Sequence, residues 1–343
     1  MPPPLQDMDG KRYRLRAFGD GDYDALGRLQ TERYPELPTT AREEQEWDGA
    51  MARAHVLNEK WVVEERTTGE VVAFAALYHA LYSYDPHKFW VLVIVDSRHT
   101  RQGVGKALAS LLNAEAADHR ALCFWTNVRK EDDRSLRFAA QQGFQSLRTT
   151  WLSVLDLSMA DLTPSEGDRR ERLERDGIRF TTLAEEGSRR PEVRRRLYEL
   201  WTDASRDVPR MGEYVPVSFE QFEAEVDREA ILPEAFFLAG HGDAYVASSH
   251  LERDLAEPTS LMVGFTATQA AFRGRGLATE LKVRSIGYAR EHGIRALKTF
   301  NDAANDPILR INERLGFRRL FAIANLQREF ARATAPGAGG GAP

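Results

Sequence analysis

Two short glycine-rich segments, one in each half of the 343-residue chain, combine residue types that could bind an anion. Residues 273–278 read RGRGLA and residues 100–105 read TRQGVG; each follows an apolar run and precedes apolar residues at helical spacing. The first N–H groups of a helix have no internal acceptor, and the helix dipole adds positive charge there. Glycine lets a phosphate approach the backbone, and Arg273 and Arg275 could add charge-assisted contacts. The expected chemistry is phosphate or pyrophosphate binding.

Two common phosphate-binding motifs do not fit these segments. A dinucleotide fingerprint requires a third glycine three residues after Gly276, where the chain has Thr279. A P-loop requires Ser or Thr after its lysine, but Lys106 is followed by Ala107, and the upstream glycine is missing as well. Nicotinamide-dinucleotide binding and P-loop nucleotide hydrolysis are therefore excluded.

The chain contains an internal repeat. Residues 101–108 (RQGVGKAL) resemble residues 274–281 (GRGLATEL), and a Gly-Phe pair follows each segment. Gly143 comes 40 residues after Gly103, and Gly316 comes 40 residues after Gly276. Two motifs in the same register predict a duplicated domain.

The glycine-rich segments resemble the coenzyme-A-binding motif R/Q-x-x-G-x-G/A of the GNAT N-acetyltransferase superfamily. Residues 273–278 match it in full, whereas Thr100 replaces its first residue in the first half, where Arg98 or Arg101 could compensate. Residues 299–317 resemble the second cofactor-contacting segment of tandem GNAT proteins, the group that includes mycothiol-synthase-like enzymes. The resemblance covers about residues 13–157 and 178–330 and is closer in the second half.

This resemblance implies two tandem acyl-CoA N-acyltransferase domains of mixed α/β (α+β) class, each a twisted sheet flanked by helices, with acetyl-CoA as cofactor. In that fold the strand before the turn splays from its neighbour and pairs with the pantetheine amides. Asn301 and Asn305 would lie near the pantetheine arm or the acceptor; capping and turn formation are the alternative role. The other residues that the resemblance assigns to cofactor binding are Phe265, Thr266, Ala267, Thr268, Arg273, Gly274, Arg275, Gly276, Leu277 and Ala278 in the second half, and Val95, Arg101, Gln102, Gly103, Val104, Gly105 and Lys106 in the first.

Acetyl transfer to an amine needs a base for the ammonium, a polarised thioester and a proton for the thiolate. Many GNAT enzymes use as acid a tyrosine four residues before the glycine of the Gly-Phe pair; here that position is Asn312 in the second half and Ala139 in the first. Asn312 could instead bond the sulfur or orient water; the alternative is a helix asparagine whose hydrogen bonds are satisfied within the fold. Of the acids before the central strand, Glu252, Asp254 and Glu257, we select Glu252 as candidate base because it ends a predicted strand at the sheet edge.

Two segments are candidates for the acceptor side. Residues 207–214 mix acids with aromatic residues between predicted helices, in a region that shapes the acceptor pocket of GNAT folds. In the first half, aromatic and histidine residues gather before the buried strand and either line a pocket or cover the sheet; these are Tyr78, His79, Tyr82, Tyr84 and His87.

Each half must position its turn between a strand and a helix. The patterns predict strands in the first half at 13–18, 61–64, 71–78, 89–95 and 121–125, with helices around 23–29, from 104 and up to about 143. The second half repeats this order with strands at 178–183, 234–238, 244–251, 261–268 and 295–300, and helices at 194–201 and from 277. Asp306 and Pro307 are predicted as N-cap and first residue of the last helix.

These elements predict domains at 11–158 and 178–332. The charged segment 159–177 is predicted to be a solvated linker or a short exposed helix, and residues 333–343, rich in glycine and alanine, a disordered tail.

Composition limits the partners. A net charge of −5 argues against nucleic acid, and no apolar run approaches the roughly 20 residues of a membrane span. The single cysteine, Cys123, lies in an apolar run and is expected to be buried in a cytoplasmic protein, and no histidine or cysteine spacing predicts a metal site.

The sequence therefore predicts an N-acetyltransferase, a monomer or homodimer, that acts on a primary amine of a small molecule through its C-terminal domain. Three alternatives stay open. These are a non-catalytic acyl-CoA-binding or sensing protein, a protein-lysine acetyltransferase, and, less favoured, an aminoacyl-transferring enzyme.

Overall fold

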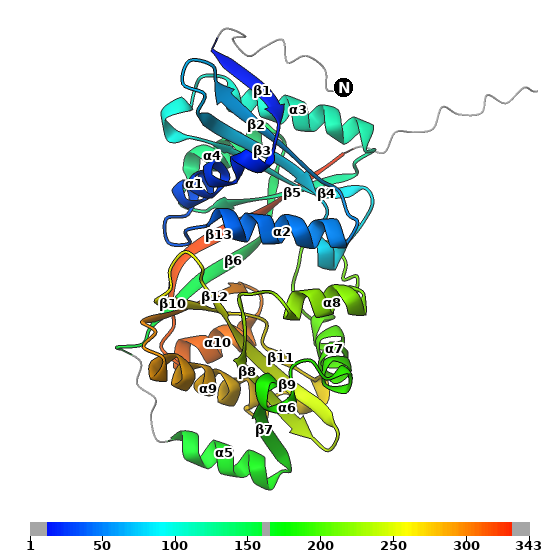
Figure 1. Ribbon diagram of the computed structural model, residues 1–343, viewed down its shortest axis with the longest axis vertical. Helices are drawn as coiled ribbons and strands as arrows, with labels where there is room; N and C mark the ends of the chain where they lie inside the picture. The colour runs from blue at the N-terminus through cyan, green and yellow to red at the C-terminus, as the bar shows by residue number, and fades with distance from the viewer. Residues whose placement is uncertain (1–11, 160–164, 331–343) are drawn as a thin grey trace, which may run out of the picture.

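The computed structural model describes residues 12–159 and 165–330, in which a single 13-stranded mixed sheet runs the length of the molecule (Figure 1). The first half contributes β1 (Tyr13–Ala17), β2 (Asn58–Glu65), β3 (Val71–Tyr78), β4 (Lys88–Val95), β5 (Cys123–Arg129) and β6 (Gln145–Asp156). The second half contributes β7 (Ile178–Thr182), β8 (Ile231–His241), β9 (Ala244–Arg253), β10 (Ser260–Val263), β11 (Ala267–Thr268), β12 (Ala296–Asp302) and β13 (Arg318–Glu329).

Helices cover both faces of this sheet. The front face carries α1 (Tyr23–Arg33), α2 (Ala41–Arg53), α6 (Leu183–Glu186), α7 (Pro191–Ser205) and α8 (Phe219–Val226). The back face carries α3 (Val104–Asp118), α4 (Asp133–Gln141), α9 (Leu277–Glu291) and α10 (Asp306–Arg314). Short 3₁₀ turns are η1 (Asp20–Asp22), η2 (Leu81–Ser83), η3 (Ser97–His99) and η4 (Ala270–Phe272), and α5 (Ser165–Arg175) connects the halves. Apolar residues of α3 and α9, such as Leu108 and Leu281, anchor the back helices to the core.

The two halves exchange their last strands. The strand order is β1-β2-β3-β4-β5-β13-β6-β12-β10-β9-β8-β7, and β13 pairs antiparallel with β5 and with β6. In turn, β6 pairs antiparallel with β12. In Figure 1 the orange-red β13 therefore runs into the upper half among blue and cyan strands, while the green β6 borders the lower half. Each half thus supplies the strand that completes the other half of the sheet.

Most predicted elements are present, with four differences. Helix α2 and the strands β6 and β13 were not predicted. The strand predicted at 261–268 is broken into β10 and β11, because residues 264–266 include one extra residue that shifts the register against β9. The last helix begins one residue earlier than predicted, with Asn305 as N-cap and Pro307 in its first turn. The segment 159–177 contains α5, whose Leu173 is only 1% exposed, so this helix packs against the core.

The limits proposed for the two domains stay a prediction. Residues 160–164 of the proposed linker and the proposed tail at 333–343 lie outside the described residues.

Candidate functional site

Both glycine-rich segments form a turn that opens a helix. Gly103 is the N-cap of α3 with φ +83°, and Gly276 is the N-cap of α9 with φ +95°. These left-handed conformations explain why glycine occupies both positions. In the second turn Gly274 is also left-handed, at φ +76°, whereas its counterpart Arg101 takes φ +61° with a side chain present. The second turn is therefore the less strained of the two.

Beside each turn, two parallel strands separate. Strand β4 pairs with β5 only from Lys88 to Trp90, although both strands continue beyond that point. Likewise β10 pairs with β12 only from Ser260 to Met262, and β11 pairs with β9 alone. The gap between the strands opens toward the glycine turn in both halves, which leaves free backbone groups on its sides.

In the first half a side chain bonds the backbone of β5 beyond the last parallel pair. Arg33, the last residue of α1, donates from Nη2 to the backbone oxygen of Asn127 at 2.5 Å and also bonds the Asn127 side-chain oxygen. Asn127 lies four residues after the first parallel pair in β5, and Phe300 holds the same place in β12. The Phe300 side chain is 38% exposed. Within the described residues no side chain hydrogen-bonds the backbone of Phe300, so the two gaps differ at this position.

The side chains of the first turn are bound to their own half. Gln102 accepts from the Tyr13 hydroxyl at 2.5 Å and from Arg12 at 2.7 Å. Arg98, which could have replaced the missing motif arginine, is paired with Asp96 and Glu70. Arg101 and Lys106 are exposed, Val104 is buried, and Gly105 lies against the side chains of Val95 and Phe138.

In the second turn the backbone is exposed and the arginines are partly engaged. Arg273 forms an ion pair with Asp207 at 2.6 Å and donates to the carbonyl of Thr268. Arg275 donates to the carbonyl of Ala271 and covers the Phe272 ring. Gly274 is fully open, since no described atom lies within 4 Å of the Cβ position that it lacks.

The other residues expected at the cofactor site of the second half lie in the connection from β10 to α9 and in the first turn of α9. Phe265 packs edge-on against Trp201, and the Thr266 hydroxyl bonds that of Ser249 at 2.9 Å. The remaining members of this group are buried or half-buried: Ala267, Thr268, Leu277 and Ala278.

Asn301 and Asn312 meet on the back face, where β12 faces α10. Asn312 Nδ2 donates to Asn301 Oδ1 at 2.7 Å. Asn312 is 2% exposed, and its own Oδ1 has no hydrogen-bond partner among the described residues. Asn305 lies apart from this pair, and its side chain makes no capping hydrogen bond within the described chain. The structure therefore brings together two of the three predicted asparagines.

Glu252 lies in the interior strand β9, between β8 and β10, so its predicted place at the sheet edge is wrong. Its carboxylate binds His250 Nε2 at 3.0 Å and Arg228 at 2.8 Å. Burial opposes ionisation, but the hydrogen bond from His250 and the charge of Arg228 outweigh it and hold the pKa of Glu252 at about 2. The other two acids, Asp254 and Glu257, both bind the buried Lys298. Glu252 is thus a firmly ionised, weakly basic carboxylate.

His250 was not predicted, although it shares a face of β9 with Glu252 at a spacing of two residues. Its ring stacks on Phe236 and Trp201, with centroids 4.7 Å and 5.4 Å apart. The ring lies against Gly264, and its Nδ1 is buried with no partner in the described chain. A histidine held by a carboxylate therefore stands directly behind the bulge that precedes the expected pantetheine strand.

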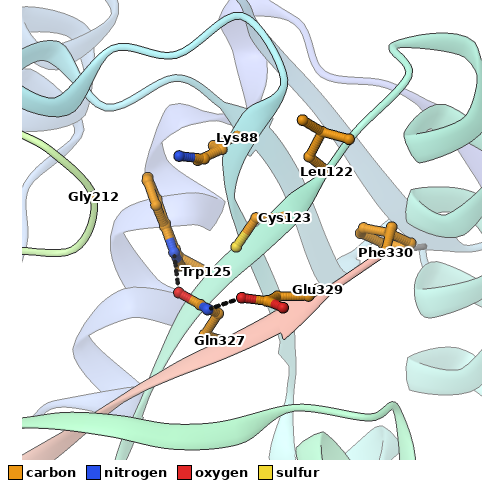
Figure 2. Close-up of a pocket in the computed structure, with 8 residues that line it drawn as sticks. All are labelled: Lys88, Leu122, Cys123, Trp125, Gly212, Gln327, Glu329 and Phe330. Atoms are coloured by element: carbon orange, nitrogen blue, oxygen red, sulfur yellow. Dashed lines mark hydrogen bonds between the residues drawn. The ribbon is translucent and has the colours of Figure 1, made fainter. Parts of the chain in front are cut away.

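The predicted acceptor segment 207–214 contacts the first half. Gly212 lies against the Trp125 ring, and Arg210 donates to the carbonyl of Tyr82 at 3.4 Å. Together with β4, β5 and β13 this loop encloses a cavity of about 370 Å³ (Figure 2). Its lining is Lys88, Leu122, Cys123, Trp125, Gly212, Gln327, Glu329 and Phe330.

Within the cavity, Trp125 donates to Gln327 at 3.0 Å, and Gln327 donates to Glu329 at 2.9 Å (Figure 2). Burial raises the pKa of the Cys123 thiol to about 12, so this buried cysteine is a packing residue as predicted.

The aromatic cluster of the first half mostly covers the sheet. His79 stacks on Phe89 and contacts Tyr84, and burial lowers the pKa of His79. Tyr82 instead lines a small groove beside α8.

One group of metal-ligand types occurs in the described chain outside the turns: Glu59, Glu115 and His119, whose ligand atoms lie within 4.8 Å of one another. His119 Nε2 is 3.4 Å from Glu59, a distance that an ordinary surface ion pair explains.

In residues 12–159 and 165–330, no helix is long and apolar enough to cross a membrane.

Each half thus combines a splayed parallel strand pair with a glycine turn that opens a helix. The model of the acetyltransferase (GNAT) family matches residues 23–144 and 194–317. The chain therefore belongs to the GNAT family and is an acyltransferase.

Solved structures share this tandem fold. A GCN5-related N-acetyltransferase from Sphaerobacter thermophilus is 20% identical, with a TM-score of 0.69 over 94% of this chain and 96% of that one. A tandem GNAT protein from the clavulanic acid biosynthesis pathway is also 20% identical, with a TM-score of 0.69 over 92% and 98%. A glucosamine N-acetyltransferase region of a fungal multi-domain β-N-acetylglucosaminidase is 13% identical, with a TM-score of 0.68 over 95% of this chain and 39% of that one. No curated protein matches the chain.

Proposed function

We propose that the second half of the chain transfers the acetyl group of acetyl-CoA to a primary amine of a small molecule. The observation that carries this assignment is the contrast between the two gaps. Arg33 bonds the Asn127 backbone oxygen beside the first gap, whereas no described side chain bonds the backbone of Phe300 at the equivalent place beside the second gap, where the motif matches in full. The cofactor supplies an activated acyl thioester, and the chain must hold it and remove a proton from the amine.

The residues of the second half fit coenzyme A. The exposed N–H groups of residues 273–278 would hold the pyrophosphate, and residues 265–268 would pair with the pantetheine amides. Asn301 would reach the pantetheine arm. Asn312 replaces the family tyrosine and donates to Asn301, so we assign it to holding Asn301 in place rather than to proton donation.

We assign the role of base to His250 and a positioning role to Glu252. A carboxylate with a pKa of about 2 is a poor proton acceptor at neutral pH. When His250 Nε2 donates to Glu252, its Nδ1 is free to accept the ammonium proton, directly or through water. Glu252 then stabilises the imidazolium that forms.

We also propose a compartment and a class of acceptor for the reaction. With a single buried thiol and a net charge of −5, the chain suits a reducing cytoplasm and a small cationic acceptor better than a nucleic acid.

Calorimetric titration of acetyl-CoA into matched variants tests the assignment. Gly276→Trp and Gly103→Trp introduce the same bulk at the same helix position, both at positive φ. Only the side chain at position 276 would meet another residue, Arg169, so the melting temperatures of both variants are measured to verify that each is folded. We expect Gly276→Trp to abolish binding and Gly103→Trp to leave it intact. The reverse result would move the working site to the first half, and no binding by the wild type would overturn the cofactor assignment.

Release of free coenzyme A thiol from acetyl-CoA, measured with a panel of small amines, then distinguishes an enzyme from a non-catalytic acyl-CoA-binding or sensing protein. We expect turnover with at least one amine, and its loss in His250→Gln without loss of acetyl-CoA affinity. Tight binding with no turnover on any amine would favour the non-catalytic alternative.

A further inference from the structure

The cavity of about 370 Å³ shown in Figure 2 lies where β4 and β5 begin. Lys88 and Cys123, which both line it, form the first parallel pair of these strands. The glycine turn of the first half comes after the other end of β4, at Val95, about 20 Å along the strand. None of the lining residues belongs to either glycine turn. The cavity is therefore separate from the expected cofactor positions, and the proposed function does not use it.

Both halves of the chain build this cavity. The loop at 206–218, between α7 and α8 of the second half, packs on Trp125 of the first. Gly212 of this loop has φ +78°, and a Cβ there would lie 2.6 Å from the Trp125 ring, so bare backbone covers the ring. The preceding Met211 is 6% exposed and belongs to the same apolar cluster as Trp125. Strand β13, which the second half also supplies, carries further lining residues. The cavity is thus a property of the two halves together.

The equivalent place in the second half is filled. Trp125 belongs to the third parallel pair of β4 and β5, and Lys298 has the same place in the pairing of β10 with β12. The buried Lys298 ammonium donates to Asp254 at 3.1 Å and to the carbonyl of Glu36 at 3.0 Å. One repeat therefore has an internal ion pair where the other has a space beside an aromatic ring. The fold itself does not require the space.

The cavity contains a carboxylate without a cationic partner. Glu329 forms no ion pair within residues 12–159 and 165–330, and it accepts a hydrogen bond from Gln327 Nε2 at 2.9 Å. The Gln327 amide is held in turn by Trp125, whose Nε1 donates to it at 3.0 Å (Figure 2). Lys88, the cation of the lining, is already paired with Asp85 at 3.2 Å. The unbalanced charge of the cavity is therefore negative.

We propose that this cavity is a second ligand site, which binds a small primary ammonium compound with an apolar body. The ammonium group would pair with Glu329, and the apolar body would lie against Trp125, Leu122 and Phe330. The volume falls within the range of small-molecule sites. This inference is independent of the proposed function, because neither acetyl-CoA nor the second glycine turn takes part in it.

Fluorine NMR of the full chain labelled with 5-fluorotryptophan tests the proposal without acetyl-CoA. The Trp125 resonance, assigned with Trp125→Phe, reports on the cavity. The Trp201 resonance, assigned in the same way, reports on the second half, because Trp201 stacks on His250. The probe is 2-phenylethylamine. Phenylacetate and 2-phenylethanol serve as controls, because each keeps the ring and replaces the ammonium by a carboxylate or a hydroxyl.

Two variants isolate the charge of the cavity. Glu329→Gln keeps the size of the side chain and removes its charge. Glu213→Gln removes an exposed carboxylate of the 206–218 loop that does not line the cavity. We expect 2-phenylethylamine to shift the Trp125 resonance saturably, with about tenfold weaker binding in Glu329→Gln and wild-type binding in Glu213→Gln. The two control compounds should bind at least about tenfold more weakly than the amine.

Three results would overturn this inference. These are an unshifted Trp125 resonance, equal responses to the three compounds, and unchanged amine affinity in Glu329→Gln. A shift of the Trp201 resonance alone would also overturn it and would place the amine in the second half, in agreement with the proposed function. Failure of acetyl-CoA to bind would overturn the proposed function and leave the response of Trp125 unaffected.

Discussion

Gly264 determines where the imidazole of His250 sits. A Cβ at this position would overlap the His250 ring and lie 2.6 Å from Glu252 Oε1, so any side chain must displace the pair. We expect Gly264→Ala to destabilise the protein by about 1–3 kcal/mol through overpacking and to reduce turnover. Urea unfolding and initial rates are the measurements.

Gly287, inside α9, provides the matched control. No described atom lies within 4 Å of its missing Cβ, and its φ is not positive. Gly287→Ala should therefore stabilise the protein by up to about 1 kcal/mol, as expected for a helix interior. If Gly264→Ala stabilises the protein as Gly287→Ala does, the close packing of His250 against Gly264 is contradicted.

Lys282 on α9 is a second residue with a measurable consequence. It is 2% exposed and lies over the Phe317 ring, and no carboxylate of the described chain pairs with it. Burial lowers its pKa from 10.5 to about 7. The unfolded chain therefore binds an extra proton between these values, so the charge destabilises the fold increasingly as pH falls from about 10.5 to about 7.

We accordingly expect Lys282→Met to be more stable than the wild type by about 4 kcal/mol at pH 7, with the difference shrinking toward pH 10. Urea unfolding across this pH range measures it. A constant difference at all pH values would mean that the gain comes from packing and not from the charge.

For single residues, the sequence predicted the site correctly where the backbone conformation requires a particular residue type. Gly103 and Gly276 were identified because a turn that opens a helix favours glycine at positive φ. Only part of the environment of Glu252 was predictable. His250 shares a face of β9 with it at a spacing of two residues, whereas Arg228 reaches it from a loop whose approach depends on tertiary packing. A short-range sequence pattern identifies the type of residue that a position needs, but not the distant residues that contact it in the fold.

Among the elements, α5 departs furthest from its sequence. Its many charged residues indicated a solvated segment, and its one leucine gave no periodic signal. Leu173 is nevertheless 1% exposed. We expect Leu173→Ala to cost about 3 kcal/mol as a core truncation, whereas Arg172→Ala on the exposed side should change stability by less than about 0.5 kcal/mol.

Thermal or urea unfolding distinguishes these two variants. Equal stabilities for both variants would show that α5 does not pack on the core.

The whole molecule depends on the exchange of β6 and β13. Without β13, the edges of β5 and β6 lose their partners, and an unpaired interior edge favours aggregation. Lys298 adds a further link, because its ammonium donates both to Asp254 of its own half and to the carbonyl of Glu36 in the other.

We expect fragments 1–160 and 161–343, produced separately, to be aggregated or unfolded, and their co-expression to restore a soluble complex. Size-exclusion chromatography and circular dichroism measure this. A first fragment that melts cooperatively as a monomer would contradict the exchange.

The exchange has no signal in the sequence for a physical reason. In a duplicated chain each strand has two nearly equivalent partners, one in each repeat. Strand β5 could pair with β6 or with its counterpart β13, and both are 12-residue strands that follow a helix and a Gly-Phe pair. Local propensity therefore predicts the strands of such a protein but does not choose between the two pairings.

The position of β13 also has a consequence during synthesis. A ribosome makes the chain from its amino end, and single domains ordinarily fold one after another as they emerge. Here β5 pairs with β13, which contains residues 318–329, so the first repeat cannot complete its sheet until almost all of the second repeat has been translated. A nascent chain that stops early keeps an open edge for chaperones and proteases, and translation to residue 329 becomes a condition for the native state.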